Sequence, residues 1–490
     1  MKYILAIDQG TTSSRAMLFD QHGQPFQMAQ REVKCLFPNS GWVEADAIAI
    51  WVSVMDVINE VLIKANITLD DIASVGLTNQ RETTIVWSKD TGMPVYNAII
   101  WQSRQSAEIC DRLSDKKELI HQKTGLLMNP YFSASKVRFI LDHIENGQKR
   151  AESGELLFGT IDSWIIYKMT SGKVHATDVT NASRTLLYNI KEMRWDKELC
   201  DIFNIPMIML PAVRPSAYDF GALEYMKTSD VHITGVIGDQ QAALFGQTCF
   251  DAGESKNTYG TGCFLLVNTG DELVLSKNGL LSTVAWQIGD KVTYALEGSV
   301  FIGGAVVQWL RDQMRLIHHS GDSESVALDS PSGEIYVVPA FTGLGTPYWD
   351  DDARGAVFGL TRSTNRSQFV RASLEAIAYQ CKDVMEVMQK ETGQTIKVLK
   401  VDGGATKNKY LMQFQSDILH TVIKLPKCLE TTALGAAYMA GLQCGFYPNL
   451  DSIRRIHEYQ AIYQPKMAKK EISRLYKGWK TAIKATRMFK

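Results

Sequence analysis

Two short loops in the sequence combine glycine with hydroxyl residues, the composition that binds phosphate. Gly10–Ser14 follows the apolar segment Tyr3–Ile7 and Asp8, and Gly260-Thr261-Gly262 lies in the second half. Backbone N–H groups of tight glycine turns bind phosphate oxygens, and hydroxyl groups add donors without bulk. Asp8 is placed to hold Mg2+, directly or through water, because Mg2+ prefers carboxylate oxygen. Each loop alone is more often a polar turn, but the combination favours phosphate binding.

A carboxylate also stands where a proton acceptor would be useful. Asp239 follows the apolar segment Ile233–Ile237 and precedes the helical segment Ala242–Phe245. A carboxylate at a strand end beside a cleft can take the proton of a hydroxyl during phosphoryl transfer. From position alone, helix capping is the commoner role of such an aspartate.

The tripeptide Gln80-Arg81-Glu82 follows another predicted strand, Ile72–Leu77. Neighbouring opposite charges often form only a solvated ion pair. A polyol site, however, needs donors and acceptors together, because each hydroxyl is both. Trp101 offers a flat apolar wall for a carbon chain, and plain core packing is its alternative role.

These residues need strands and helices that present them. Helical spacing after Asp46, a plausible N-cap, predicts a helix with a buried face of Ile48, Trp51, Val52, Met55, Ile58, Val61 and Leu62. Strands and helices alternate along the chain, which predicts an α/β architecture.

One pattern occurs twice. The strand before Asp8 leads into Asp-x-Gly-x-Thr, and the strand Val398–Val401 leads into Asp402-Gly403-Gly404-Ala405-Thr406. Matching strand ends in opposite halves predict a duplicated architecture with a cleft between the copies. The pattern breaks near Phe250–Glu254, so we expect an N-terminal lobe over 1–250 and a C-terminal lobe over 251–490.

Composition narrows the class of protein. The chain has 490 residues, 45% hydrophobic and 21% charged, with a net charge of −1. This size predicts at least two domains, and the charge balance argues against a nucleic-acid partner. Eight cysteines without a Cys-x-x-Cys pair predict reduced, buried thiols. We see no signal peptide and no apolar stretch long enough for membrane insertion, so we expect a cytoplasmic protein.

Taken together, these segments resemble the FGGY carbohydrate kinases, and among them the members that phosphorylate glycerol. The resemblance runs from Tyr3 to about Tyr447. It rests on Asp8–Arg15, Gly41–Glu44, Asn79–Thr84, Thr180–Thr185, Gly238–Gln247, Asn257–Cys263, Pro339–Trp349, Gly355–Glu375, Val401–Ala405 and Ala433–Ala437.

The resemblance implies a two-lobed, actin-like and ribonuclease-H-like ATPase fold with an interlobe cleft. It implies transfer of the ATP γ-phosphate to a terminal hydroxyl of glycerol, giving sn-glycerol 3-phosphate, in glycerol catabolism. The implied cofactors are ATP and Mg2+, with Asp8 as the metal ligand, and the implied assembly is a homodimer or homotetramer.

The resemblance also implies a role for individual residues. Asp239 matches the catalytic base. The implied substrate contacts are Arg81, Glu82, Trp101, Tyr131, Asp239, Gln240 and Phe264. The implied nucleotide contacts are Thr11, Thr12, Ser13, Arg15, Thr261, Gly304, Gln308, Gly404 and Asn408, with Gly404 near the adenine.

The sequence departs from the family pattern in three places. Phe139 stands where tryptophan is usual, which is a conservative core change. The segment Tyr218–Thr234 lacks a glycine/arginine effector loop, and His232 does not match a regulatory phosphohistidine. The Lys- and Arg-rich segment from Gln464 is weakly matched and predicts a solvated helix.

Three alternatives stay open at this point. Another family member could act on xylulose, ribulose or a longer polyol, although the aromatics Trp101 and Tyr131 leave room for a short chain. An actin-like or chaperone-like ATPase would have less use for Arg81, Glu82 and Asp239 together. A nicotinamide enzyme is disfavoured, because no Gly-x-Gly-x-x-Gly opens a helix after the first strand.

Overall fold

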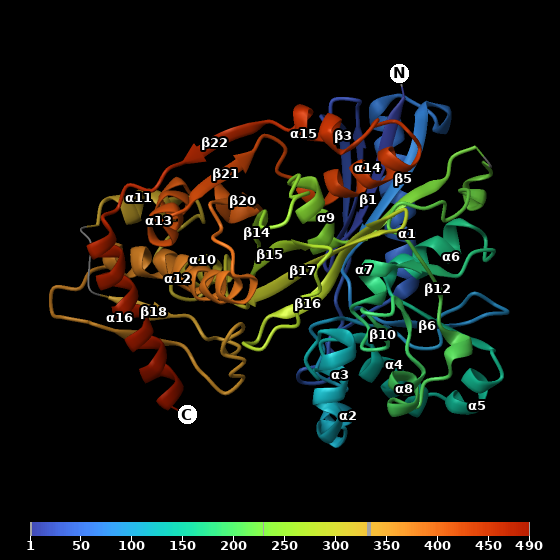
Figure 1. Cartoon of the computed structure of the whole chain (residues 1–490), viewed down its shortest axis with the longest axis horizontal. Helices are drawn as coiled ribbons and strands as arrows, with labels where there is room; N and C mark the ends of the chain where they lie inside the picture. Colours follow the sequence, from blue (N-terminus) through green and yellow to red (C-terminus); the bar gives the residue numbers. More distant parts are fainter. Residues whose placement is uncertain (1, 229, 331–334, 490) are drawn as a thin grey trace.

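The computed structural model describes residues 2–228, 230–330 and 335–489, and it has two lobes, each built on a sheet (Figure 1). The first sheet has the order β13-β5-β1-β2-β3. Its strands are β1 (Tyr3–Gln9), β2 (Ser13–Phe19), β3 (Pro25–Glu32), β5 (Ile72–Asn79) and β13 (Ile233–Gly238). Strand β1 pairs antiparallel with β2 and parallel with β5. The loop after Gln9 is therefore the turn of a β1–β2 hairpin.

Helices cover both faces of this sheet, which is why β1 is buried along its whole length. Leu5 and Ile7 pack in one core cluster with α1 (Ala47–Ala65), whereas Ile4 and Ala6 pack in another with α14 (Thr431–Gln443). The side chains alternate between the faces as strand geometry requires. Thus a helix from the C-terminal part of the chain closes one face of the first sheet.

The helix predicted after Asp46 is confirmed as α1. The Asp46 carboxylate accepts hydrogen bonds from the backbone N–H groups of Ile48 and Ala49. The predicted apolar face is largely correct, but Val52 is 48% exposed. Its side chain lies outside the stripe that meets the sheet.

The second sheet repeats the topology of the first. Its order is β16-β17-β15-β14-β20-β21-β22. The strands are β14 (Ser255–Tyr259), β15 (Cys263–Gly270), β16 (Leu281–Ile288), β17 (Lys291–Val300), β20 (Val398–Asp402), β21 (Val422–Pro426) and β22 (Tyr459–Tyr463). Strand β14 pairs antiparallel with β15 and parallel with β20.

The predicted duplication is confirmed, but the strands and loops that correspond between the two lobes are not the ones that the sequence suggested. By its pairing, β14 occupies the place of β1, and β20 occupies the place of β5. The counterpart of the loop Gly10–Thr12 is therefore Gly260–Gly262, not the loop after Asp402. The residue types in the loops suggested the wrong counterpart, because equivalent loops are defined by the pairing of the strands that they follow.

A large insertion between β5 and β13 forms the lower part of the first lobe in Figure 1. It contains β6 (Ile85–Ser88), β7 (Ala98–Ile99), α2 (Ala107–Arg112), α3 (Lys117–Thr124), α4 (Ser133–His143), α5 (Gly147–Glu152), β8 (Leu156–Gly159), α6 (Ile161–Met169), β9 (Ala176–Asp178), α7 (Val179–Ala182), β10 (Tyr188–Asn189), β11 (Arg194–Trp195), α8 (Lys197–Ile202) and β12 (Ala212–Arg214). The two-residue strand β4 (Glu44–Ala45) pairs with β7. This insertion carries Trp101 and Tyr131 toward the space between the lobes.

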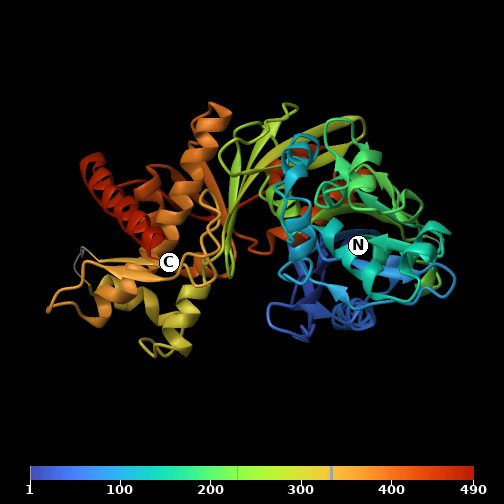
Figure 2. The ribbon, with the colours of Figure 1, turned by 90° about the horizontal axis from the view of Figure 1, so that it is seen from below.

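Helices also cover the second sheet (Figure 2). The remaining α-helices and strands are α9 (Asp239–Gly246), α10 (Ala305–Asp312), α11 (Asp322–Leu328), β18 (Tyr336–Val338), β19 (Ala356–Phe358), α12 (Arg366–Thr392), α13 (Lys409–Leu419), α15 (Leu450–Ile456) and α16 (Lys469–Met488). Helix α9 packs against α14, which covers the first sheet, and also contacts β14 and β15 of the second sheet. It therefore connects the two sheets.

The expectation of a solvated C-terminal helix is wrong. In α16, Leu475, Trp479 and Ile483 belong to the core of the second lobe, and Trp479 is 0% exposed. The indole of Trp479 stacks on Tyr379 and donates to Asp383 at 2.8 Å. The Lys and Arg residues occupy only the outer face of an amphipathic helix.

The cysteines agree with a reduced protein, though they are not all buried. All eight are unpaired; Cys35 and Cys428 are half-buried and Cys444 is exposed. No helix within the described ranges has the length and apolar character needed to cross a bilayer.

Candidate active site

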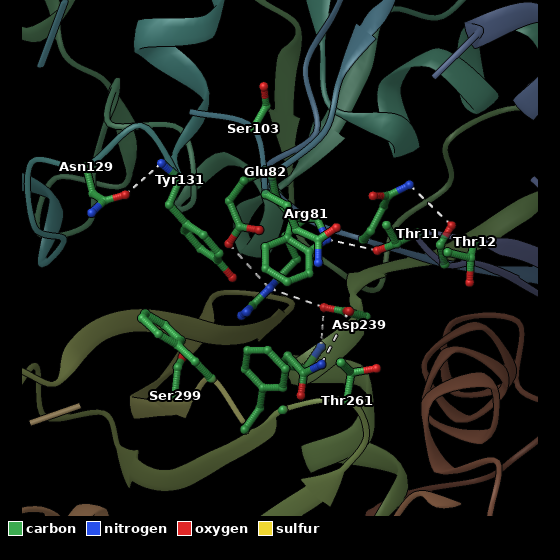
Figure 3. Close-up of a pocket in the computed structure, with 18 of the residues that line it drawn as sticks. Thr11, Thr12, Arg81, Glu82, Ser103, Asn129, Tyr131, Asp239, Thr261 and Ser299 are labelled. Atoms are coloured by element: carbon green, nitrogen blue, oxygen red, sulfur yellow. Dashed lines mark hydrogen bonds and ion pairs between the residues drawn. The ribbon is translucent and has the colours of Figure 1, made fainter. Parts of the chain in front are cut away.

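The predicted phosphate and substrate residues surround one cavity of about 660 Å³ between the lobes (Figure 3). The loops after β1, β5 and β13 and the β14–β15 hairpin all open into it. The predicted residues that line it are Asp8, Thr11, Thr12, Ser13, Arg15, Arg81, Glu82, Trp101, Tyr131, Asp239, Gln240, Thr261 and Phe264.

The other predicted nucleotide residues line a second cavity of about 330 Å³ in the second lobe. Gly304, Gln308, Gly404 and Asn408 are among its lining residues. Thr261 lines both cavities, so they meet at the loop Gly260–Gly262. The structure thus brings all the predicted site residues together in two adjoining cavities.

Arg81 and Glu82 are not a solvated ion pair, because they are 2% and 1% exposed. The Arg81 Nε atom lies 3.2 Å from Asp239 Oδ1 and 3.6 Å from Glu82 Oε1. A buried charge must be paired to be tolerated. The arrangement supplies both a donor edge and carboxylate acceptors at one point of the cavity.

Asp239 does not act as the helix cap. The N-cap of α9 is Gly238, and Asp239 is the first helical residue. Its Oδ1 accepts from the backbone N–H of Gln240 at 2.7 Å, and its side chain is 29% exposed on the cavity side. Burial raises the pKa of the Asp239 carboxyl, and the nearby Arg81 guanidinium opposes that rise. A carboxylate with a raised pKa is a stronger proton acceptor.

Two aromatic rings form one wall of the cavity. The rings of Trp101 and Tyr131 meet edge to face, with centroids 5.5 Å apart. The Trp101 indole donates to Thr11 Oγ1 at 2.9 Å, which joins this wall to the loop Gly10–Ser14. Trp101 is therefore a cavity residue as well as a packing residue.

A buried lysine fixes the turn that carries Tyr131. The Lys136 ammonium is 0% exposed and donates to the carbonyls of Pro130, Tyr131 and Phe132. Three carbonyls in a row satisfy all three donors of the ammonium. The backbone of the turn is thereby held in place next to the cavity.

The surroundings of Asp8 suit a divalent cation. Burial raises the pKa of Asp8 to about 7, although Arg15 partly offsets the rise, and the neighbouring Asp239 adds to it. The Arg15 guanidinium lies 3.8 Å from Asp8 but only 3.0 Å from Glu430. Mg2+ needs only one or two carboxylates when waters and phosphates complete its coordination. A poorly neutralised carboxylate beside the predicted phosphate loop Gly10–Ser14 fits that requirement, although the described parts of the chain contain no cluster of three acidic, His or Cys ligands.

Comparison with known proteins decides the family. The N-terminal domain of the FGGY family of carbohydrate kinases matches residues 3–246, and its C-terminal domain matches residues 255–444. The chain belongs to the FGGY family of carbohydrate kinases.

Individual relatives agree with this assignment. The glycerol kinase of Bacillus licheniformis is 54% identical over 499 residues, and the alignment covers 100% of both chains. The glycerol kinase of Thermus thermophilus is 54% identical over 500 residues, again covering 100% of both. The crystal structure of Plasmodium falciparum glycerol kinase with ADP superposes with a TM-score of 0.93 at 38% identity, covering 99% of this chain and 98% of that one. The expected two-lobed, actin-like ATPase fold is confirmed.

The sequence analysis missed three buried charges beside the first cavity of this FGGY kinase. Arg184 and Glu297 are each 0% exposed. Arg184 donates a hydrogen bond to Glu82, and Glu297 accepts one from Arg81. Lys256 is also 0% exposed, and its ammonium donates to Gln240 and to Thr258. Glu297 interrupts the apolar strand β17, so a charge inside a buried strand was the signal that could have identified it.

Proposed function

We propose that this FGGY kinase transfers the γ-phosphate of ATP to a terminal hydroxyl of glycerol, giving sn-glycerol 3-phosphate and ADP. The observation that carries the proposal is the buried pair Arg81 and Glu82 beside the half-buried Asp239, in a cavity that Trp101 and Tyr131 also line. The full-length relatives named glycerol kinase support the choice of glycerol within the family.

In the proposed mechanism, the first cavity orients the acceptor. Arg81 donates to the hydroxyls and Glu82 accepts from them, while Trp101 and Phe264 contact the carbon chain. Asp239 accepts the proton of the attacking hydroxyl as the oxygen approaches the phosphorus atom. Gln240 holds Asp239 through the backbone contact at 2.7 Å.

The nucleotide lies along the two hairpin loops in this proposal. Thr11, Thr12, Ser13 and Arg15 bind the phosphates from the first lobe, and Thr261 binds them from the second. Gly304, Gln308, Gly404 and Asn408 form the rest of the nucleotide site in the second cavity. Bound Mg2+, held by Asp8, would neutralise the charge of the phosphates. Donors fixed around the transferring group stabilise its charge.

The lobe division at about residue 250 stays a prediction, and so do a cytoplasmic location and a homodimer or homotetramer. Residues from both halves line the first cavity, including Arg81 and Phe264. We therefore expect closure of the lobes to complete the site and exclude water, which competes with glycerol as acceptor.

The test is ADP release with Mg-ATP and a panel of glycerol, dihydroxyacetone, erythritol, D-ribulose, D-xylulose or no acceptor. Stimulation by glycerol alone, or by glycerol and dihydroxyacetone, is the expected result. Preference for a pentulose would keep the mechanism and overturn the substrate. Turnover that is equal in every condition would overturn the acceptor site and favour a partner-driven ATPase.

A further inference from the structure

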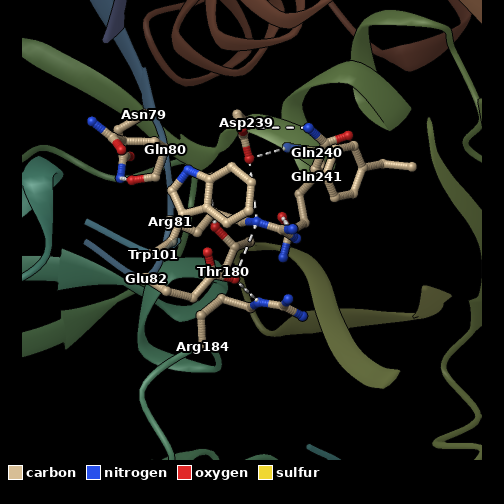
Figure 4. A network of polar contacts seen from close by, with 12 residues as sticks. Asn79, Gln80, Arg81, Glu82, Trp101, Thr180, Arg184, Asp239, Gln240 and Gln241 are labelled. Atoms are coloured by element: carbon tan, nitrogen blue, oxygen red, sulfur yellow. Dashed lines mark hydrogen bonds and ion pairs between the residues drawn. The ribbon is translucent and has the colours of Figure 1, made fainter. Parts of the chain in front are cut away.

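Four buried charges, Arg81, Glu82, Arg184 and Glu297, form a closed network behind the first cavity. Figure 4 shows the first three of them. Arg81 and Glu82 follow β5, Arg184 follows α7, and Glu297 lies within β17 of the second sheet. Arg184 and Glu297 are 0% exposed, and neither lines the cavity, whereas Arg81 and Glu82 do. Arg184 and Glu297 therefore act on a bound molecule only through Arg81 and Glu82.

Glu297 fixes the direction of the Arg81 guanidinium. Its Oε2 accepts from Arg81 Nη1 at 2.5 Å, and its Oε1 accepts from Nη2 at 2.9 Å. Because the guanidinium is planar with donors in a rigid fork, a bidentate contact at one edge sets the direction of the other. The Nε edge is left toward Asp239, 3.2 Å away.

Arg184 connects the two carboxylates of the network. Its Nε donates to Glu82 Oε1 at 2.7 Å, and its Nη2 donates to Glu297 Oε1 at 3.1 Å. It thus fixes the carboxylate of Glu82. Although burial raises the pKa of Glu297, Arg184 and Arg81 hold it at about 2. Glu297 is therefore a permanent anion that needs both arginines.

The network also gives a role to the segment Thr180–Thr185, which the proposed mechanism leaves unused. Thr180 Oγ1 accepts from the N–H of Gly238, the residue before Asp239, at 2.8 Å. Ser183 bonds to Thr283 of β16 at 3.1 Å, and Arg184 reaches β17. One short segment thus connects the end of β13 and two strands of the second sheet.

We propose that Glu297 and Arg184 are positioning residues that orient Arg81 and Glu82 toward the acceptor, so that a strand of the second lobe completes the acceptor site. This inference rests on the proposed function of the first cavity. It predicts that changes in Glu297 or Arg184 affect the acceptor far more than the nucleotide, because neither residue lines the second cavity.

The test compares Glu297→Gln and Arg184→Lys with the wild type. Each change removes part of a charged hydrogen-bond pair, which is worth about a 10- to 100-fold loss in kcat/KM for the acceptor. The KM for ATP and the Kd for ADP should stay within about twofold. Arg138→Gln is the matched control, since Arg138 is a 9% exposed arginine of the same lobe, paired with Asp142 at 2.8 Å and absent from both cavities. This control should leave both kinetic constants unchanged.

Two features keep the test decisive. If Glu297→Gln does not bind ADP and so has not folded, Glu297→Asp, which keeps the charge but shortens the reach, takes its place. The double variant Arg184→Lys/Glu297→Asp should lose much less than the product of the single losses, because both residues act in one network. Equal effects on the acceptor and on ATP, or an unchanged kcat/KM for the acceptor, would overturn the proposal.

The experiment separates this inference from the proposed function. The wild type is first assayed with the panel of acceptors, and every variant is then assayed with the acceptor that the wild type prefers. A pentulose preference would overturn glycerol as substrate, but the selective loss for the preferred acceptor would still support the roles of Glu297 and Arg184.

Discussion

Replacing Asp239 by Asn tests the proposed base without changing the shape of the site. Asn keeps an oxygen that can accept from Gln240 N–H at 2.7 Å and lie 3.2 Å from Arg81 Nε. What it loses is the ability to take a proton. General base catalysis contributes about 10²- to 10⁴-fold, which is about 2.7–5.4 kcal/mol of barrier. We expect kcat to fall by that factor.

The assay is steady-state ADP release with glycerol, and the Kd for ADP is measured by calorimetry. Asp201→Asn is the control, since Asp201 is an exposed aspartate paired with Lys197, and it should match the wild type. An Asp239→Asn variant that retains kcat within about threefold would refute the base. A variant that no longer binds ADP would indicate misfolding, and Asp239→Glu would then be compared.

The pH dependence provides a second test of Asp239. The base acts when it is unprotonated, so wild-type kcat/KM should fall as the pH is lowered through its pKa. Burial raises this pKa above 3.8, Arg81 and Lys256 oppose the rise, and Glu82 adds to it. The acid limb of the profile should therefore lie above the ordinary range of an aspartate. In Asp239→Asn this limb should disappear.

Three further predictions follow from particular contacts. Burial raises the pKa of Asp8 from its ordinary value of 3.8 to about 7 in the fold. Ionising Asp8 therefore destabilises the metal-free protein by about 4 kcal/mol at most as the pH rises from about 4 to 7. Asp8→Asn should melt at a higher temperature than the wild type at pH 8, with a smaller difference at pH 5, and should lose turnover. Trp479→Ala should destabilise the second lobe by about 3–5 kcal/mol in urea unfolding, whereas Met488→Ala, at a 77% exposed position of the same helix, should have little effect. A Cβ at Gly404 meets no protein atom within 4 Å and would enter the second cavity. Gly404→Ala should therefore weaken ADP binding by about 1–3 kcal/mol and leave the melting temperature unchanged. Unchanged ADP binding would remove Gly404 from the nucleotide site.

The residues that could be predicted are those whose signal is local. Asp8, Arg81 and Asp239 each follow a short apolar strand, and a strand end is recognisable within about ten residues of sequence. Their gathering in one cavity follows from the fold, because the ends of neighbouring parallel strands meet at one edge of a sheet. Glu297 and Arg184 have no such signal. Glu297 pairs with Arg81 across 216 positions of sequence, and no local pattern encodes that contact.

The prediction for the C-terminal helix was wrong for the opposite reason: a local signal was present, but the prediction relied on charge content instead. The Lys and Arg content of α16 suggested a solvated segment. Ile472, Leu475, Trp479 and Ile483, however, recur at helical spacing and all lie in the core. Periodicity, not net composition, decides whether a charged helix packs.

The duplication explains how one fold makes two different ligand sites. The hairpin loops after β1 and β14 are topological equivalents, and on the proposed roles each binds phosphate from its own lobe. The strands β5 and β20 are equivalents too, but their ends differ. The first is followed by Arg81 and Glu82, whose charges suit hydroxyl groups. The second is followed by Gly403, which lies against the Tyr259 backbone, and by Gly404, which borders open space. On the proposed roles, the shared topology directs both loops at one phosphate chain. The differing strand ends would then place acceptor and nucleotide at opposite ends of that chain, which is the arrangement that phosphoryl transfer needs.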